Sequence, residues 1–197
     1  MPGMVRSPTR PGSSWLDRAL AALSVGAPAF AAGVIVATGV AAAIAFPTMK
    51  TLDPSLPGFA AVPDHWMIAA GRVMAPIFTI TVAGAVLAMA LATLAWALQV
   101  LRAQFGVRVL LVRGVALLLT LAVAGHLQFA LLPRMNANFA TFLAAARAGD
   151  TNAALTARDA FDQDHPSSGR EFGAVAALAL VCAGLSILPT RRRDRSA

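Results

Sequence analysis

The sequence predicts an all-α integral membrane protein: a four-helix bundle with short amphipathic helices in the outer loop between helices three and four. Hydrophobic residues make up 58% of the 197 residues and charged residues only 13%, against about 45–50% and about 25% in soluble domains. The apolar residues are also gathered in long runs. Runs of roughly 18 or more apolar residues are typical of membrane-spanning helices, and this arrangement predicts the class.

Four apolar runs are the expected spans. The first run reaches Phe46 and meets Pro47, where the missing N–H of proline predicts a helix end. This run is longer than the roughly 7–15 apolar residues of a signal peptide, so we expect it to be retained. A face for close helix packing is predicted by small residues that recur every four positions, at Ala29, Gly33, Ala37 and Ala41.

The chain is expected to have three parts. Residues 1–18 form a disordered arm, residues 19–189 form the four-span domain and residues 190–197 form a basic tail. The spans lie near 22–46, 70–98, 111–132 and 171–188, and residues 133–170 form the outer loop.

The outer loop is expected to contain two short helices. Phe139 and Leu143 are spaced as neighbours on one helix face. Gly149 is expected to end this first helix, and Asp150 or Thr151 is expected to cap the second.

A proline and a capping pattern predict where the fourth span starts. The pair His165-Pro166 is expected to break the second short helix. Ser168 is followed three residues later by Glu171, which is the form of a capping box. We therefore expect Ser168 to begin a new helix.

The distribution of arginines predicts the orientation. Four spans place both termini on one side of the membrane. The terminal segments and the 102–113 connection carry ten arginines and two aspartates, whereas the opposite side carries six basic and seven acidic residues. Cytoplasmic segments are enriched in Lys and Arg, so we expect a multi-pass protein of the plasma (inner) membrane with both termini cytoplasmic. This distribution also accounts for the net charge of +7, and no nucleic-acid partner is expected.

Ionisable residues inside the spans are the first candidates for a site, since a charge in the hydrocarbon is costly. Arg72 and His126 lie inside the second and third spans. We expect them to face the bundle interior as a polar floor, with Asp162 and His165 above them on an outer-loop lid. The alternatives are an Arg72 side chain that snorkels to the interface and a neutral His126 bonded to a neighbouring helix.

His65, Asp164 and Glu171 are weaker candidates, since residues of these types are common in exposed loops. Asp162, Asp164, His165 and Glu171 have residue types suited to a metal ion, but the D-x-D-H pattern is unspecific, and no metal site is predicted. No cofactor is identified. Haem is disfavoured because His126 has no partner histidine at its own depth.

Four short motifs resemble a known family. FPTMK (46–50), AAGRVMAPIF (69–78), LLPRMNANF (131–139) and FDQDH (161–165), followed by an apolar helix, occur in an order similar to the four-span bacterial membrane proteins of domain of unknown function 4149. The anthrone oxygenase-like group, domain of unknown function 1772, is also similar, with Pro133 and Asn136 at its matching positions. That group tends to have a tryptophan and an arginine near the loop histidine, whereas this chain has Phe161 and the more distant Arg170.

The sequence leaves three classes of function open. The first is an accessory or structural membrane protein, and the second is a membrane-embedded enzyme, cofactor-free or metal-assisted, acting on a lipophilic substrate at the outer leaflet. The third is a small transporter subunit. The expected partners are the lipid bilayer and a lipophilic small molecule, and a homo-oligomer stays open.

Overall fold

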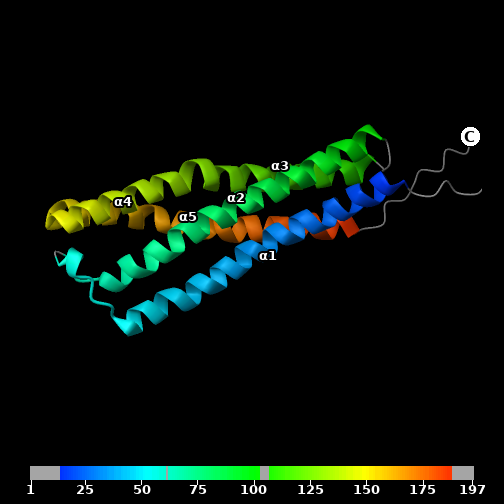
Figure 1. The fold of residues 1–197 in the computed structure, drawn as a ribbon. Coiled ribbons are helices and arrows are strands. Elements are labelled where there is room, and N and C mark those ends of the chain that lie inside the picture. Colours follow the sequence, from blue (N-terminus) through cyan, green and yellow to red (C-terminus); the bar gives the residue numbers. More distant parts are fainter. Residues whose placement is uncertain (1–13, 61, 103–106, 188–197) are drawn as a thin grey trace, which may run out of the picture.

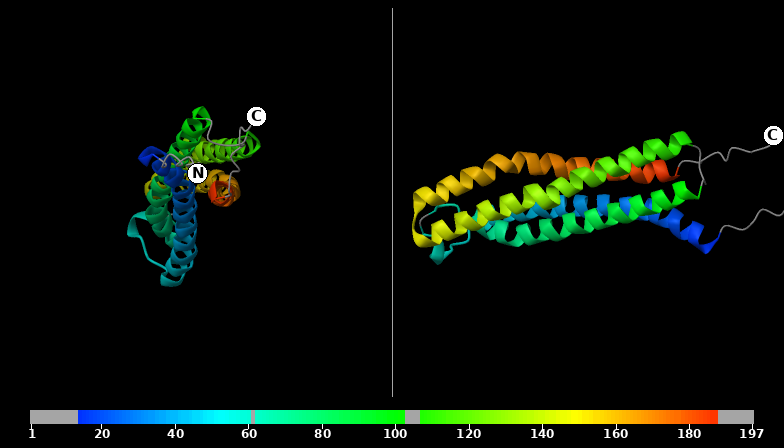
Figure 2. Two further views of the ribbon diagram at one scale, coloured as in Figure 1. Left: turned by 90° about the vertical axis from the view of Figure 1, so that its right-hand side faces the viewer. Right: turned by 90° about the horizontal axis from the view of Figure 1, so that it is seen from above.

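The described residues form four long helical columns that pack into one elongated bundle (Figures 1 and 2). The computed structural model describes residues 14–60, 62–102 and 107–187. The elements are α1 (Trp15–Leu52), the short 3₁₀ helix η1 (Pro57–Phe59), α2 (His65–Leu101), α3 (Val107–His126), the π-helical turn η2 (Leu127–Leu131), α4 (Leu132–Ala148) and α5 (Thr151–Ile187). Elements α3, η2 and α4 follow one another along a single column.

Four candidate membrane spans lie in these columns, with lengths of 38, 37, 39 and 37 residues. At 1.5 Å per residue each is roughly 55 Å long, against a hydrocarbon core of about 30 Å. The start of α1, the end of α2, the start of α3 and the end of α5 lie at one end of the bundle, the proximal end (Figure 1). The α1–α2 connection and the α4–α5 turn lie at the other, the distal end.

The prolines do not end the helices where we expected. Helix α1 continues through Pro28 and Pro47 to Leu52, and α2 continues through Pro76. A proline removes one helical hydrogen bond, and bundled membrane helices tolerate this loss. The expected helix end at Pro47 is therefore wrong. Helix α1 also begins at Trp15, earlier than residue 19, with Ser14 and Asp17 in a capping box; the rest of the expected arm and the basic tail lie outside the described residues.

The predicted short helices of the outer loop are wrong, because the third and fourth columns continue into this region without a break. Pro133 lacks an N–H and its ring would meet the carbonyl of Phe129, four residues earlier. The turn η2 resolves this conflict by widening the helix, with the Leu132 N–H bonded to the Leu127 carbonyl. Helix α4 then ends at Gly149, as expected, with φ of 78°.

Helix α5 begins where a cap was expected but does not break where a break was expected. The Asp150 carboxylate accepts the Ala153 N–H at 2.9 Å. Pro166 lies inside the helix, and the Ser168 hydroxyl donates to the His165 carbonyl at 2.8 Å. Ser168 therefore lies in the middle of a helix, and the capping-box prediction for it is wrong.

The core of the proximal and middle bundle is built largely from small side chains. Ala31, Ala85, Ala92 and Ala179 are fully or almost fully buried where the helices meet. The expected packing face of α1 does not pack against the other described helices, because its four small residues are all exposed: Ala29, Gly33, Ala37 and Ala41. A helix that is apolar on every side does not reveal from its sequence which face is buried.

Gly114 is expected to be indispensable for the packing of α2 against α3. A Cβ atom built at Gly114 collides with the indole of Trp96, whose N–H is held by the Leu110 carbonyl at 3.0 Å. We expect Gly114→Ala to destabilise the protein by about 1–3 kcal/mol through overpacking. Gly125→Ala on the same helix meets nothing within 4 Å and should leave stability unchanged or raise it by up to about 1 kcal/mol. Thermal unfolding of both variants in detergent measures this, and equal stability would contradict it.

Candidate functional site: a cavity at the distal end

A cavity of about 840 Å³ lies between the helices in the distal half of the bundle. Its volume falls within the range of about 300–1,000 Å³ that ligand pockets occupy. The cavity exists because the α1–α2 pair separates from α4 and α5 towards the distal end (Figure 1). Aromatic and methionine side chains supply much of the wall, among them Phe46, Met74, Phe78, Met135, Phe139, Phe161 and Phe172.

The aromatic wall is held by contacts between columns. The ring of Phe139 on α4 lies 5.8 Å from that of Phe161 on α5, and the ring of Phe78 on α2 lies 5.3 Å from that of Phe172. Gly71 makes room for this wall, since a Cβ there would lie 2.7 Å from Cζ of Phe139. Phe139 and Phe161 therefore face inward from two long helices.

The cavity opens between α1 and α5. Lining residues on α2 and α4 are buried or half-buried, whereas exposed lining residues occur on α1 and α5. On each of these helices they recur every three or four residues, so they form one stripe per helix. The two stripes are Val36, Gly39, Ala43 and Pro47 on α1, and Asp162, His165, Gly169 and Gly173 on α5. The small side chains in these stripes leave a gap through which a ligand can enter.

Polar side chains are spread along the length of the cavity wall. Arg158 donates to Asp64, the residue before α2, at 2.7 Å, and its Nε lies 3.6 Å from the Asp162 carboxylate. The Asn136 amide donates to the Thr79 hydroxyl at 3.3 Å. These contacts join α5 to α2 and α4 to α2 around the cavity. They leave the amide oxygen of Asn136 available to a ligand.

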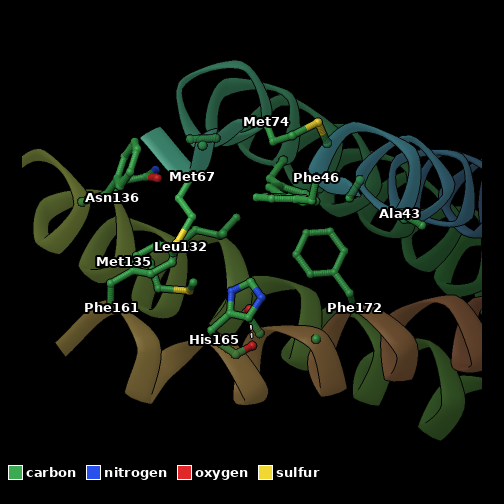
Figure 3. A pocket seen from close by; sticks show the side chains of 18 of the residues that line it. Ala43, Phe46, Met67, Met74, Leu132, Met135, Asn136, Phe161, His165 and Phe172 are labelled. Carbon is green, nitrogen blue, oxygen red and sulfur yellow. Dashed lines mark hydrogen bonds between the residues drawn. The ribbon is translucent and has the colours of Figure 1, made fainter. Parts of the chain in front are cut away.

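His165 and Asp162 line the cavity, as two of the four leading candidates. The imidazole of His165 points into the cavity towards Phe172 and Met67 (Figure 3). Its ring packs on Phe161 with centroids 5.8 Å apart. Within the described part of the chain, neither ring nitrogen has a hydrogen-bond partner, so both are available to a ligand.

Arg72 and His126 do not line the cavity, and the expected polar floor is wrong. Gly71 faces the cavity, and one residue further along a helix the side chain turns by about 100°. Arg72 is accordingly exposed. The His126 side chain is 58% exposed, and its Nδ1 lies 3.0 Å from each Glu171 carboxylate oxygen. His126 thus matches the alternative of a histidine bonded to a neighbouring helix.

His65 and Asp164 have structural contacts. His65 Nδ1 accepts the Leu56 N–H at 3.0 Å, so its Nε2 carries the proton and donates to the Phe59 carbonyl at 2.9 Å. Asp164 accepts two hydrogen bonds from Arg134, at 2.7 and 2.6 Å. No group of three or more His, Cys, Asp or Glu residues in the described ranges is placed to hold a metal ion.

A second polar cluster, not predicted from the sequence, lies in the proximal half. Arg113 is only 5% exposed, and its Nη1 donates to the Gln99 side-chain oxygen at 3.0 Å. The Gln99 amide donates to the Ser24 hydroxyl at 3.1 Å, and Ser24 donates to the Leu20 carbonyl. Nε and Nη2 of Arg113 are buried without a partner among the described residues. The sequence places Arg113 where the 102–113 connection meets the third span, and Gln99 near the end of α2 is the one signal there of a buried partner.

This proximal cluster yields a stability prediction. Gln99→Leu removes the neutral acceptor of a buried guanidinium, and losing a hydrogen bond to a charged group costs about 1.5–3 kcal/mol. The double variant Gln99→Leu/Arg113→Leu removes the charge as well and should be more stable than Gln99→Leu alone. Unfolding in detergent, measured for both variants, checks the order. A double variant less stable than the single one would show that Arg113 is held by other contacts.

Comparison with known proteins adds no relative: no family model, no curated protein and no solved structure matches the chain.

Proposed function

We propose that this chain is a multi-pass membrane protein that binds an amphipathic, lipid-like molecule in the distal cavity. The observation that carries the proposal is the apolar cavity of about 840 Å³, open between α1 and α5. A cleft with apolar walls and a few convergent polar groups is the usual form of a small-molecule site. Four candidate spans supply the membrane setting.

The position of the cavity relative to a membrane supports a lipid-like ligand. Large exposed apolar side chains follow α1 from Leu23 to Ile44 and α2 from Val73 to Leu98, and in a bilayer these would face lipid. Exposed basic side chains come next towards the distal end, one on each column: Lys50, Arg72, Arg134 and Arg170. Basic residues at this position pair with lipid head groups or snorkel to them. The cavity would then extend from the hydrocarbon into the head-group layer.

Two further functions remain open as proposals. The resemblance to the domain of unknown function 4149 and anthrone oxygenase-like families is compatible with the four-column architecture. An anthrone oxygenase-like membrane enzyme would use the available imidazole of His165 beside its substrate. An accessory protein would use the same cavity only to hold a lipid. No feature of the described residues favours a transporter subunit.

The orientation follows from the charges and is tested by fusion proteins. We propose that the distal end faces the outside and that both termini are cytoplasmic, because arginines are concentrated in the proximal connections. A reporter that is active only in the periplasm should be active when fused after Gly149 and inactive after Gly106 or Ser196. Activity at Gly106 would reverse the orientation.

The binding function is tested by closing the gap between α1 and α5. A side chain at Gly39 has nothing within 4 Å of its Cβ and would project into the opening. We expect Gly39→Phe to weaken binding of a fluorescent monoacylglycerol to the purified protein by about tenfold or more, equivalent to about 1.4 kcal/mol.

Gly33→Phe is the matched control. Gly33 lies on the same helix, is exposed, has equal space around its Cβ and does not line the cavity. The Gly33→Phe variant should bind the fluorescent monoacylglycerol as the wild type does, and the two variants should unfold at similar temperatures. Equal binding of the probe by Gly39→Phe and Gly33→Phe would contradict the proposed function.

A further inference from the structure

We infer that the cavity selects an amphiphile with an uncharged, hydrogen-bonding head group, such as a hydroxyl or carbonyl, and rejects the same chain with a phosphate. The inference rests on the proposed function and adds the chemical class of the ligand. It follows from the charges and the available hydrogen-bonding groups that line the cavity.

The cation at the cavity is already neutralised. Arg158 and Asp162 are the charged residues among those that line it. Arg158 is hydrogen-bonded to Asp64 at 2.7 Å and lies 3.6 Å from Asp162. Together these three side chains carry a net negative charge. A phosphate placed here would face Asp162 without an available cation, and like charges at short range in a partly buried site repel strongly.

Uncharged hydrogen-bonding groups remain for the ligand. Asn136 uses one N–H on Thr79 and keeps its oxygen and its other N–H. His165 offers a ring nitrogen that donates and one that accepts, since neither is engaged within the described residues. Ser168 donates to a carbonyl but its oxygen can still accept. A hydroxyl or carbonyl head group can satisfy these groups without any added charge.

The available cations lie outside the cavity. Lys50, Arg72 and Arg170 are exposed, and none of them lines it. Phosphate head groups of bulk lipid are therefore expected to meet these residues on the outer surface of the bundle. This separation lets the cavity discriminate against the phospholipids that surround it.

Two probes that differ only in a phosphate test the inference. Monooleoylglycerol and its phosphate ester, monooleoyl lysophosphatidic acid, compete with the fluorescent monoacylglycerol for the purified full-length protein in uncharged detergent. We expect the neutral lipid to compete about tenfold better or more, which corresponds to about 1.4 kcal/mol. Equal competition, or better competition by the phosphate ester, overturns the inference.

Variants tie the selectivity to named residues. Asp162→Asn should improve competition by the phosphate ester several-fold, whereas Asp159→Asn should not, because Asp159 is exposed on the same helix and does not line the cavity. Asn136→Leu and His165→Phe should each weaken binding of the neutral lipid by roughly three- to tenfold, the range for losing one hydrogen bond. If Asp162→Asn, Asn136→Leu and His165→Phe all compete as the wild type does, the inference is wrong.

The same assay separates the two levels of the proposal. If the two lipids compete equally for the wild type but Gly39→Phe still blocks binding, only the head-group inference is overturned. If Gly39→Phe leaves binding of the fluorescent lipid unchanged, both the proposed function and the inference are overturned.

Discussion

The length of the helical columns is the constraint on which the rest of the structure depends. The candidate spans in the columns are 37–39 residues long, while about 20 residues suffice to cross a bilayer. In a bilayer the columns would therefore continue beyond the hydrocarbon, and helices that pack closely in one half separate in the other. The separation creates the cavity, and the continuity of α3 with α4 and of α5 across Pro166 keeps its walls rigid. A lid on flexible loops would not fix aromatic rings in this way.

The sequence predicted the number and apolar character of the columns well, because a run of apolar residues is a signal that tertiary packing does not alter. It predicted helix ends poorly wherever proline was the signal. Pro47 and Pro166 lie inside helices, since a single missing hydrogen bond costs less than unwinding a packed helix. At Pro133 the widened turn η2 absorbs the clash. Local turn chemistry was a reliable signal only where no column had to continue, at Gly149 and Asp150.

The candidate site was only partly predictable for a related reason. His165 and Asp162 follow one another at helical spacing, so they share a face whichever way the helix turns. The direction of the Arg72 side chain depends on how α2 is rotated about its own axis. A helix that is apolar on every side has no sequence pattern that predicts this rotation. Arg113 was missed because the sequence places it near a loop, whereas the end of α2 supplies Gln99 as its buried partner. Side-chain contacts between helices, such as that of Arg113 with Gln99, cannot be predicted from a single amino-acid sequence.

The cavity lies where two kinds of packing meet. Most of the core is a cluster rich in alanine, in which small side chains bring helices close enough for van der Waals contact. The distal core is a separate cluster around Phe59, Ile68 and Phe142, and outside the bilayer such a cluster is stabilised by the hydrophobic effect in water. Aromatic rings such as Phe78 and Phe172 pack against the first cluster and line the cavity. The cavity beside them has largely apolar walls and a few uncharged hydrogen-bonding groups, among them Asn136 and Ser168. A site with that character, open at the side, suits a molecule that already resides in the membrane.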